Sequence, residues 1–241
     1  MGGRLFRRIT QEKSIVIACD VSSIERLQEI VVNSCDLDLV GAYKIGFSLV
    51  LRFGLPKVVS VIRNYSEKPI IYDHQKGATD VPHTGIIFSE ALSEAGVDYA
   101  IIFPFSGPST QIAWIESLKK SGVIPIVGGA LTISDFLNSN GGYIAEEAAL
   151  KIFKVASNMG VEDYVLPGNN LQLLNHYKQN IDLIVKSPIY YLPGLGAQGG
   201  DIRLCGKIMG RHWHAIVGRS VYTAKDIKSA LMTLISDLQT D

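Results

Sequence analysis

The feature of this sequence that most constrains its fold is a regular alternation of short β-branched apolar runs with longer amphipathic stretches. Runs such as SIVIAC, PIIY, YAIIF and HAIVG are uninterrupted, which is typical of parallel strands that are buried on both faces. The runs predict eight strands, at Ile15–Cys19, Leu39–Ile45, Pro69–Tyr72, Tyr99–Phe103, Ile124–Val127, Tyr164–Leu166, Ile189–Leu192 and Ala215–Val217. The amphipathic stretches predict helices at Ser23–Asn33, Ile86–Ala95, Gln111–Lys120, Glu146–Met159, Asn169–Gln179 and Lys225–Gln239.

Eight strands that alternate with helices indicate an α/β protein of the (β/α)8 TIM-barrel class, formed as a single domain over residues 1–241. The length agrees, because such barrels contain about 250 residues. A doubly wound open sheet would usually carry a glycine-rich loop after its first strand, and here the sequence at that point is Cys19-Asp20-Val21. No Pro/Ser-rich linker or change of composition divides the chain.

The composition argues against several classes of function. Charged residues make up 19% of the chain and sum to zero net charge, so nothing indicates binding to nucleic acid or to a membrane surface. No run approaches the roughly 20 apolar residues of a membrane span, and no apolar stretch near the start suits a signal peptide. Cys19, Cys35 and Cys205 are an odd number at unrelated spacings, which favours a reducing compartment over a disulfide framework. We therefore expect a cytoplasmic location.

Polar residues gather where the predicted strands end, which is where barrels of this class carry their chemistry. The first strand leads to Asp20 and the second to Lys44, while the third is followed by Asp73, Lys76 and Asp80. Buried opposite charges stay ionised only when they pair, so lysines and carboxylates that converge at a barrel mouth indicate a functional array. Surface salt bridges are the alternative interpretation.

The segments after the seventh and eighth strands predict a phosphate site. In PGLGAQGGD, glycines such as Gly194 and Gly196 let backbone N–H groups approach an anion, and Gln198 adds an amide donor. After Gly218, Arg219 offers a planar fork of donors to phosphate oxygens. These two loops often form the phosphate site of a barrel. A glycine-rich turn beside a surface arginine is the alternative.

The histidines do not predict a metal centre. His74 and His83 flank the polar group after the third strand, but neither has a second His or Cys at ligand spacing. His176, His212 and His214 fall within predicted helices or near strand starts and are expected to be structural.

With these residues in hand, the sequence resembles the orotidine 5′-monophosphate decarboxylase family over nearly its whole length. Asp20 stands where that family has its ribose-contacting aspartate, and Lys44, in YKIG, stands where it has its strand-two lysine. The third-strand group resembles the family's Asp-x-Lys-x-x-Asp-(Ile/Val)-Pro-x-Thr signature. PGLGAQGGD and IVGRS are similar to its phosphate loop and its phosphate-binding arginine.

Two departures from the family pattern lead to local expectations. The third-strand signature here reads Asp-x-x-Lys-x-x-x-Asp-Val-Pro-x-Thr, one residue longer in each gap. Residues three apart on a strand do not share a face, so a bulge near His74–Gln75 or Gly77 is needed to restore a common direction. After the fifth strand the family usually has a hydroxyl residue in a Ser/Thr-His-Pro-Gly context, and Thr132 takes that place here.

The resemblance implies decarboxylation of orotidine 5′-monophosphate to UMP in de novo pyrimidine synthesis, with neither cofactor nor metal. Lys76 would protonate the carbon-6 carbanion, Asp73 would lie beside the leaving carboxylate, and Lys44 would pair with Asp73. Asp80 would reach the active site of a neighbouring subunit, which makes the enzyme a homodimer. The implied substrate-binding residues are Asp20, Thr84, Thr132, Pro193, Gly194, Gly196, Gln198, Gly218 and Arg219.

Three other functions remain open. A Mg²⁺-dependent sugar-phosphate decarboxylase or aldolase could use the same barrel, although such relatives typically carry Glu where Lys44 stands. A Schiff-base aldolase could use Lys76, but that chemistry needs a lowered lysine pKa and neighbouring carboxylates raise it. The longer third-strand spacing also leaves open a non-catalytic nucleotide-binding relative.

Overall fold

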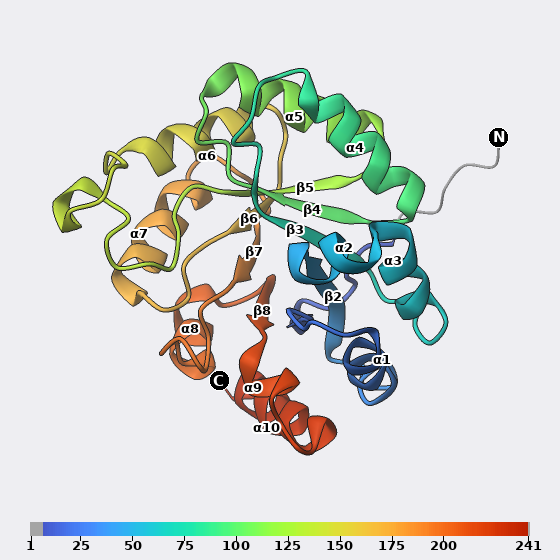
Figure 1. Cartoon of the computed structure of the whole chain (residues 1–241). Coiled ribbons are helices and arrows are strands. Elements are labelled where there is room, and N and C mark those ends of the chain that lie inside the picture. Colours follow the sequence, from blue (N-terminus) through green and yellow to red (C-terminus); the bar gives the residue numbers. More distant parts are fainter. Residues whose placement is uncertain (1–6, 241) are drawn as a thin grey trace.

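The computed structural model describes residues 7–240, with the backbone alone described at Gln75 and Lys76. Eight parallel strands pair in chain order and close between β1 and β8, which confirms the predicted (β/α)8 barrel (Figure 1). The strands are β1 (Lys13–Ala18), β2 (Val40–Gly46), β3 (Ile70–Gly77), β4 (Tyr99–Ile102), β5 (Ile124–Gly128), β6 (Asp163–Val165), β7 (Ile189–Leu192) and β8 (Trp213–Val217).

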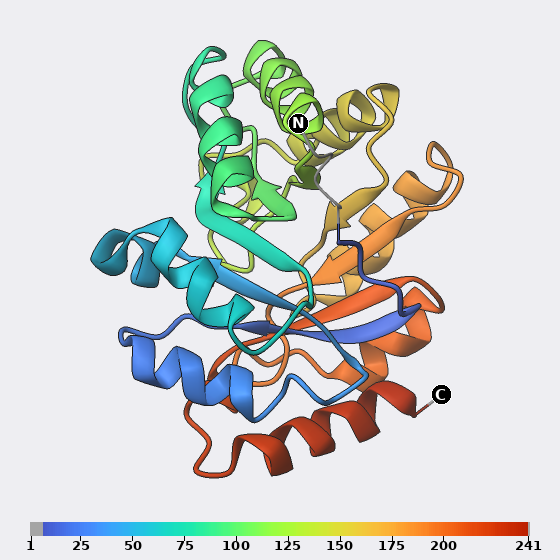
Figure 2. The same cartoon turned by 90° about the vertical axis from the view of Figure 1, so that its right-hand side faces the viewer.

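Helices surround the barrel, and a turned view shows the C-terminal helix running along its side (Figure 2). All six predicted helices are present, with ends that differ by a few residues from the prediction. The helices are α1 (Ile24–Val32), α2 (Phe47–Phe53), α3 (Leu55–Arg63), α4 (Thr84–Ala95), α5 (Pro108–Lys120), α6 (Ala148–Asn158), α7 (Leu171–Asp182), α8 (Ile202–Met209), α9 (Arg219–Tyr222) and α10 (Ile227–Gln239), with a 3-10 turn, η1, at Asn138–Asn140.

Side-chain caps begin four of these helices. Ser23, Asn170, Asp201 and Asp226 each accept a hydrogen bond from a backbone N–H in the first turn that follows. Helices α2 and α3 were not predicted, because α2 begins directly after β2 without a side-chain cap and the two helices meet at Gly54. Helix α8 was also not predicted, although its Asp201 cap is a readable signal.

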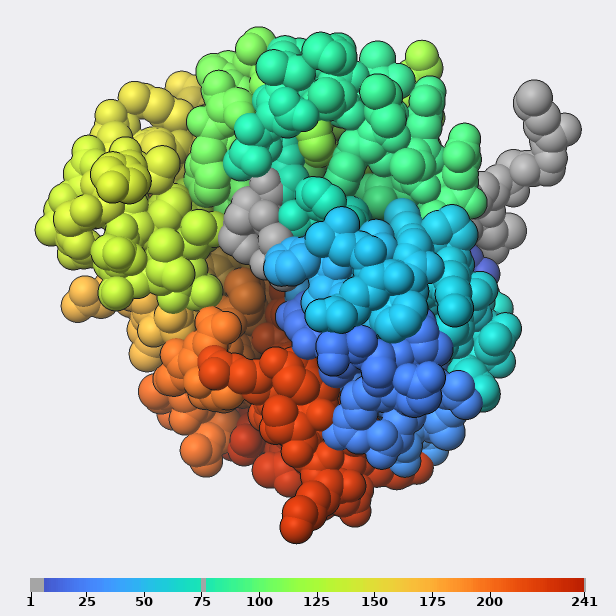
Figure 3. Space-filling view, in the orientation of Figure 1, coloured from blue at the N-terminus to red at the C-terminus, as the bar shows by residue number. Residues whose placement is uncertain are grey.

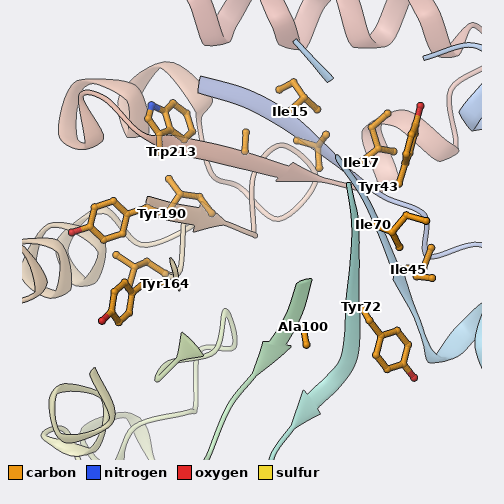
Figure 4. Close-up of a cluster of buried hydrophobic side chains, with 14 of the residues drawn as sticks. Ile15, Ile17, Tyr43, Ile45, Ile70, Tyr72, Ala100, Tyr164, Tyr190 and Trp213 are labelled. Atoms are coloured by element: carbon orange, nitrogen blue, oxygen red, sulfur yellow. The ribbon is translucent and has the colours of Figure 1, made fainter. Parts of the chain in front are cut away.

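Alternate residues of each strand face either the barrel interior or the helices. In β1, Val16 and Ala18 belong to the inner cluster, whereas Ile15 and Ile17 belong to the outer one. Figure 4 shows part of that outer cluster, including Ile15 and Ile17. The inner cluster is Val16, Ala18, Ala42, Ile71, Tyr99, Ile101, Phe103, Ile126, Val165, Tyr191 and Ile216.

The amino-terminal end of the barrel interior holds buried polar groups. The hydroxyl of Tyr191 donates to Asp163 Oδ1 over 2.9 Å, and Ser14 Oγ lies 2.9 Å from His214 Nδ1. Burial raises the pKa of Asp163 to about 6 and lowers the pKa of His214 to about 3. This end of a barrel serves stability rather than catalysis. Within residues 7–240, no helix combines the length and apolar character needed to cross a membrane.

Candidate active site

A cavity of about 240 Å³ opens at the carboxyl ends of the strands. Figure 3 shows a hollow at this mouth, between orange atoms of the segment after β7 and yellow-green atoms of the segment after β5. Each strand, or the segment that follows it, contributes to the wall. The lining residues are Ala18, Asp20, Lys44, Asp73, Ile101, Phe103, Ala130, Leu131, Thr132, Val165, Pro193, Gly194, Leu195, Ala197, Gln198, Ile216, Gly218, Arg219 and Tyr222.

Lys44 is fixed between two carboxylates at the base of this cavity. Its Nζ lies 3.2 Å from Asp20 Oδ1 and 3.1 Å from Asp73 Oδ2. In the sheet Lys44 is paired with Ala18 of β1 and with Ile71 of β3. Alternate residues share a face, so Asp20, two after Ala18, and Asp73, two after Ile71, turn to the same interior side as Lys44.

The electrostatics of this triad keep the lysine charged. Lys44 is only 4% exposed and Asp73 only 8%. Burial by itself lowers the pKa of Lys44, but the carboxylates of Asp73 and Asp20 raise it by more, so the pKa ends above its ordinary value. Lys44 is therefore an ammonium at neutral pH, and its charge is matched within the array.

The predicted bulge in the third strand is confirmed. Asp73 pairs with Ile101 of β4, but the next paired residue of β3 is Gly77, opposite Ile102. Three residues, 74–76, are therefore inserted against a single step of β4. The side chain of Lys76, the predicted proton donor, lies outside the described residues.

The bulge inverts the alternation of β3. Asp73 faces the interior, whereas a Cβ at Gly77 would lie 3.6 Å from Phe88 and 3.7 Å from Trp114, on the helix side. Positions four apart on a regular strand would share one face. His74 is not among the residues that line the cavity, and its ring lies beside Tyr72 and Phe88 instead.

The segment after β7 is a tight glycine-rich loop. Gly194, Gly196 and Gly199 have φ values of 90°, 67° and 94°, which favour glycine. The loop closes on itself through Gly196 N–H to Gly200 O at 2.8 Å and Gly200 N–H to Gly194 O at 3.0 Å. A Cβ at Gly200 would lie 2.7 Å from the Gly194 carbonyl oxygen, so a side chain at position 200 does not fit.

Arg219 begins α9 and lines the same end of the cavity as this loop. Its Nη2 donates to the carbonyl oxygen of Ala197 over 3.2 Å, beside Gln198. Among the described residues Arg219 forms no ion pair, whereas Lys44 has two carboxylates. The loop end of the cavity thus presents an unneutralised cation and is suited to an anion.

Thr132 and an apolar wall complete the cavity. The carbonyl of Thr132 accepts a hydrogen bond of 3.0 Å from Asn169 Nδ2. The sequence reasoning did not identify the wall or Tyr222 as part of the site. Most residues of the apolar wall could have been predicted from the sequence, because they are inward-facing positions near the carboxyl ends of strands. The unpredicted wall residues that belong to the inner cluster are Ala18, Ile101, Phe103, Val165 and Ile216.

Three predicted site residues, Asp80, Thr84 and Gly196, do not line the cavity of this single chain. Asp80 is exposed and its Oδ1 accepts the backbone N–H of Val81 over 2.7 Å. Thr84 donates its hydroxyl to the Val81 carbonyl over 2.7 Å. Among the described residues, no group of three or more His, Cys, Asp and Glu side chains is placed to hold a metal ion.

Comparison with known proteins shows which family and which individual proteins the chain is similar to. The family model described as "Orotidine 5'-phosphate decarboxylase / HUMPS family" matches residues 13–234. The orotidine 5'-phosphate decarboxylase of Thermoplasma volcanium is 29% identical over 88% of this chain and 86% of its own length. That of Methanosarcina mazei is 29% identical over 94% and 96%, respectively. The crystal structure of the Methanocaldococcus jannaschii enzyme with the inhibitor BMP superposes with a TM-score of 0.83 at 24% identity, covering 95% of this chain and all of that one.

Proposed function

Because the chain belongs to the Orotidine 5'-phosphate decarboxylase / HUMPS family, we propose that it converts orotidine 5′-monophosphate to UMP in pyrimidine biosynthesis. The proposal includes a cofactor-free reaction in which Lys76 is the proton donor. The observation that carries it is the Lys44 ammonium held between Asp20 and Asp73, in the same cavity as Arg219, which forms no ion pair among the described residues. A substrate with one reacting carboxylate and one phosphate fits that distribution of charge.

The reaction breaks the bond between carbon 6 and the carboxylate, releases CO2 and leaves the electron pair on carbon 6. No π system receives that pair, so the site itself must stabilise the charge. An ammonium at Lys76 beside carbon 6 would do so and then transfer its proton to carbon 6, which yields UMP. The Asp73 carboxylate, held in place by Lys44, would lie beside the leaving group and disfavour negative charge there.

The described neighbours of Lys76 support its assignment. Asp73, just before the bulge, faces the cavity, and position 77, just after it, faces the helices. Lys76 lies in the insertion between these two positions, three residues after Asp73, which lines the cavity.

The other end of the cavity would bind the phosphate. Arg219 would offer two parallel donors, and the glycine-rich loop after β7 would offer backbone N–H groups other than those of Gly196 and Gly200, which bond within the loop. Gln198 would add its amide from the same loop. Thr132 would contact the pyrimidine and Asp20 the ribose, since both line the wall between the two ends.

We also propose that the enzyme is a homodimer in which Asp80 completes the active site of the partner. Asp80 is exposed in the single chain and points to no cavity residue. Next to it, Val81, Ile86 and Ile87 leave 46%, 53% and 68% of their surface exposed. Apolar side chains gathered beside a functional loop are typical of an interface. The three free cysteines agree with a location in the reducing cytoplasm.

The metal-dependent alternative places different demands on the site. A sugar-phosphate decarboxylase or aldolase that uses Mg²⁺ needs oxygen ligands directed at the metal. Here Lys44 occupies the centre of the carboxylate array and forms ion pairs with both carboxylates. A cation in that place opposes the binding of a second cation, so the array favours orotidylate over an Mg²⁺-bound sugar phosphate.

One assay tests the activity directly. Purified protein, treated with EDTA, should remove the absorbance of orotidylate with no added metal or cofactor. Lys76→Ala should abolish this turnover while UMP still binds, as measured by calorimetry. Turnover of Lys76→Ala within tenfold of the wild type would show that another group donates the proton. Absence of turnover in the wild type, with UMP binding retained, would favour a non-catalytic nucleotide-binding protein.

A further inference from the structure

The inserted residues of β3 are fastened from outside the barrel by His74. The hydroxyl of Tyr72 lies 2.5 Å from His74 Nδ1. The imidazole packs edge-on against Phe88 of α4, with ring centroids 6.0 Å apart, and lies 5.5 Å from the Tyr72 ring. Tyr72 is itself buried in the outer cluster. His74 thus attaches the start of the insertion to the layer between strand and helix.

This hydrogen bond joins a protonated phenol to an imidazole nitrogen. Burial, with a smaller contribution from the Asp73 charge, raises the pKa of Tyr72 to about 12, so the phenol stays protonated. A protonated hydroxyl can donate to Nδ1 or accept from an Nδ1–H group, so the tautomer of His74 sets the direction of the bond.

The insertion needs such an anchor because the strand ladder does not hold it. Between Asp73 and Gly77 no residue pairs with β4. Directly after it, Ala78 has φ of 70°, a left-handed conformation that costs a non-glycine residue about 1 kcal/mol or more. Farther along, side chains also bond to the segment, with Trp114 Nε1 donating to the Val81 carbonyl over 3.2 Å and Thr110 Oγ1 donating to the Asp80 carbonyl over 2.9 Å.

We infer that His74 is a positioning residue for the decarboxylation, which holds the path of the β3 insertion through Tyr72 and Phe88 and thereby sets the placement of Lys76. The inference rests on the proposed role of Lys76 as proton donor. His74 does not line the cavity, and its Nδ1 bonds to Tyr72, so we expect it to act on geometry and not on the substrate.

Four variants isolate the hydrogen bond from the packing, and a fifth serves as the control. His74→Phe keeps an aromatic ring against Phe88 but removes the imidazole nitrogen, Tyr72→Phe removes the hydroxyl, and the double variant combines both changes. His74→Asn restores a polar group near the place of Nδ1. The matched control is His176→Phe, because His176 is an exposed histidine of α7 that does not line the cavity.

The inference predicts a loss in kcat without a loss in affinity. His74→Phe should lower kcat by about 10- to 100-fold, since a shift of about 1 Å at a reacting group costs up to about 100-fold. The Kd for UMP should stay within threefold, because the phosphate site lies on β7 and β8. Tyr72→Phe and the double variant should match His74→Phe, His74→Asn should recover most of kcat, and His176→Phe should resemble the wild type.

Three results would overturn the inference. The first is a kcat within twofold of the wild type in His74→Phe. The second is a Kd for UMP that weakens in parallel with kcat, which indicates general disruption. The third is additive losses in the double variant, which show that the two side chains act separately. A wild-type protein without turnover would refute the proposed function itself, and that result is distinguishable because it precedes any comparison of variants.

Discussion

Removal of the Arg219 guanidinium is the most direct test of whether this residue binds the substrate phosphate. Among the described residues, two cations line the cavity, and Lys44 forms ion pairs with carboxylates whereas Arg219 does not. A charge-assisted hydrogen bond contributes about 1.5–3 kcal/mol, and a guanidinium can make two of them to a phosphate. Because Arg219 is exposed in the open chain, the lower end of that range applies. Arg219→Ala should therefore lose at least about 3 kcal/mol, or roughly 150-fold in kcat/KM.

The assay compares two substrates. With orotidine 5′-monophosphate the loss should appear in full, whereas with the nucleoside orotidine, which has no phosphate, kcat/KM should change by less than threefold. Arg219→Lys should recover part of the loss, since it keeps the charge but not the fork. The control is Arg203→Ala, because Arg203 is an exposed arginine of α8 that pairs with Asp201 and lies outside the cavity. A loss below tenfold for the nucleotide, or an equal loss for both substrates, would refute the phosphate role of Arg219.

Three further predictions address the triad, the dimer and the opposite end of the barrel. Lys44→Met should lower the free energy of unfolding by about 3 kcal/mol in urea, because it removes the ammonium that forms ion pairs with Asp20 and the buried Asp73; a loss below 1 kcal/mol would contradict the importance of these ion pairs. Mixing inactive Lys76→Ala and Asp80→Ala chains should restore roughly a quarter of wild-type activity, since half of a random set of dimers is mixed and each mixed dimer has one intact site; no recovery would exclude a shared site. Asp163→Asn should stabilise the protein by about 2–3 kcal/mol at pH 7.5, since the folded-state pKa of about 6 lies above the ordinary 3.8 and the contribution of a protonated Asp163 is lost as pH rises through 6. That gain should vanish as pH falls below 3.8, and a pH-independent gain would refute it.

The sequence was sufficient to predict the barrel and the inward triad for one physical reason. Uninterrupted apolar runs mark parallel strands, and the residues that follow such runs lie at one end of a closed sheet. Asp20, Lys44 and Asp73 each follow or end a run, so their convergence needed only the alternation of faces. The loop of Gly194 and Gly196 was equally visible, because its positive φ angles restrict it to glycine.

The size of the bulge, helix α2 and the role of Asp80 could not be predicted in the same way, because they depend on contacts that a single sequence does not display. The sequence predicted a bulge near His74, but its size of three residues depends on the ladder with β4 and on the aromatic contact with Phe88. Helix α2 was missed because it starts without a cap directly after a strand. The position of Asp80 relative to an active site cannot be tested in a single chain, because its proposed site is formed with a second chain.

The distribution of charge along the cavity explains why the phosphate end should control the chemistry at the other end. Lys44 forms ion pairs with both Asp20 and Asp73, and the Asp73 carboxylate would repel the carboxylate of an orotidylate bound beside it. Arg219, which forms no ion pair among the described residues, would supply the compensating attraction through the phosphate. Binding free energy gained at the phosphate can thus hold the substrate carboxylate beside Asp73, where loss of CO2 removes the repulsion. UMP has no such carboxylate, so it should bind without that opposing interaction, and its affinity should depend on Arg219 but only weakly on Asp73.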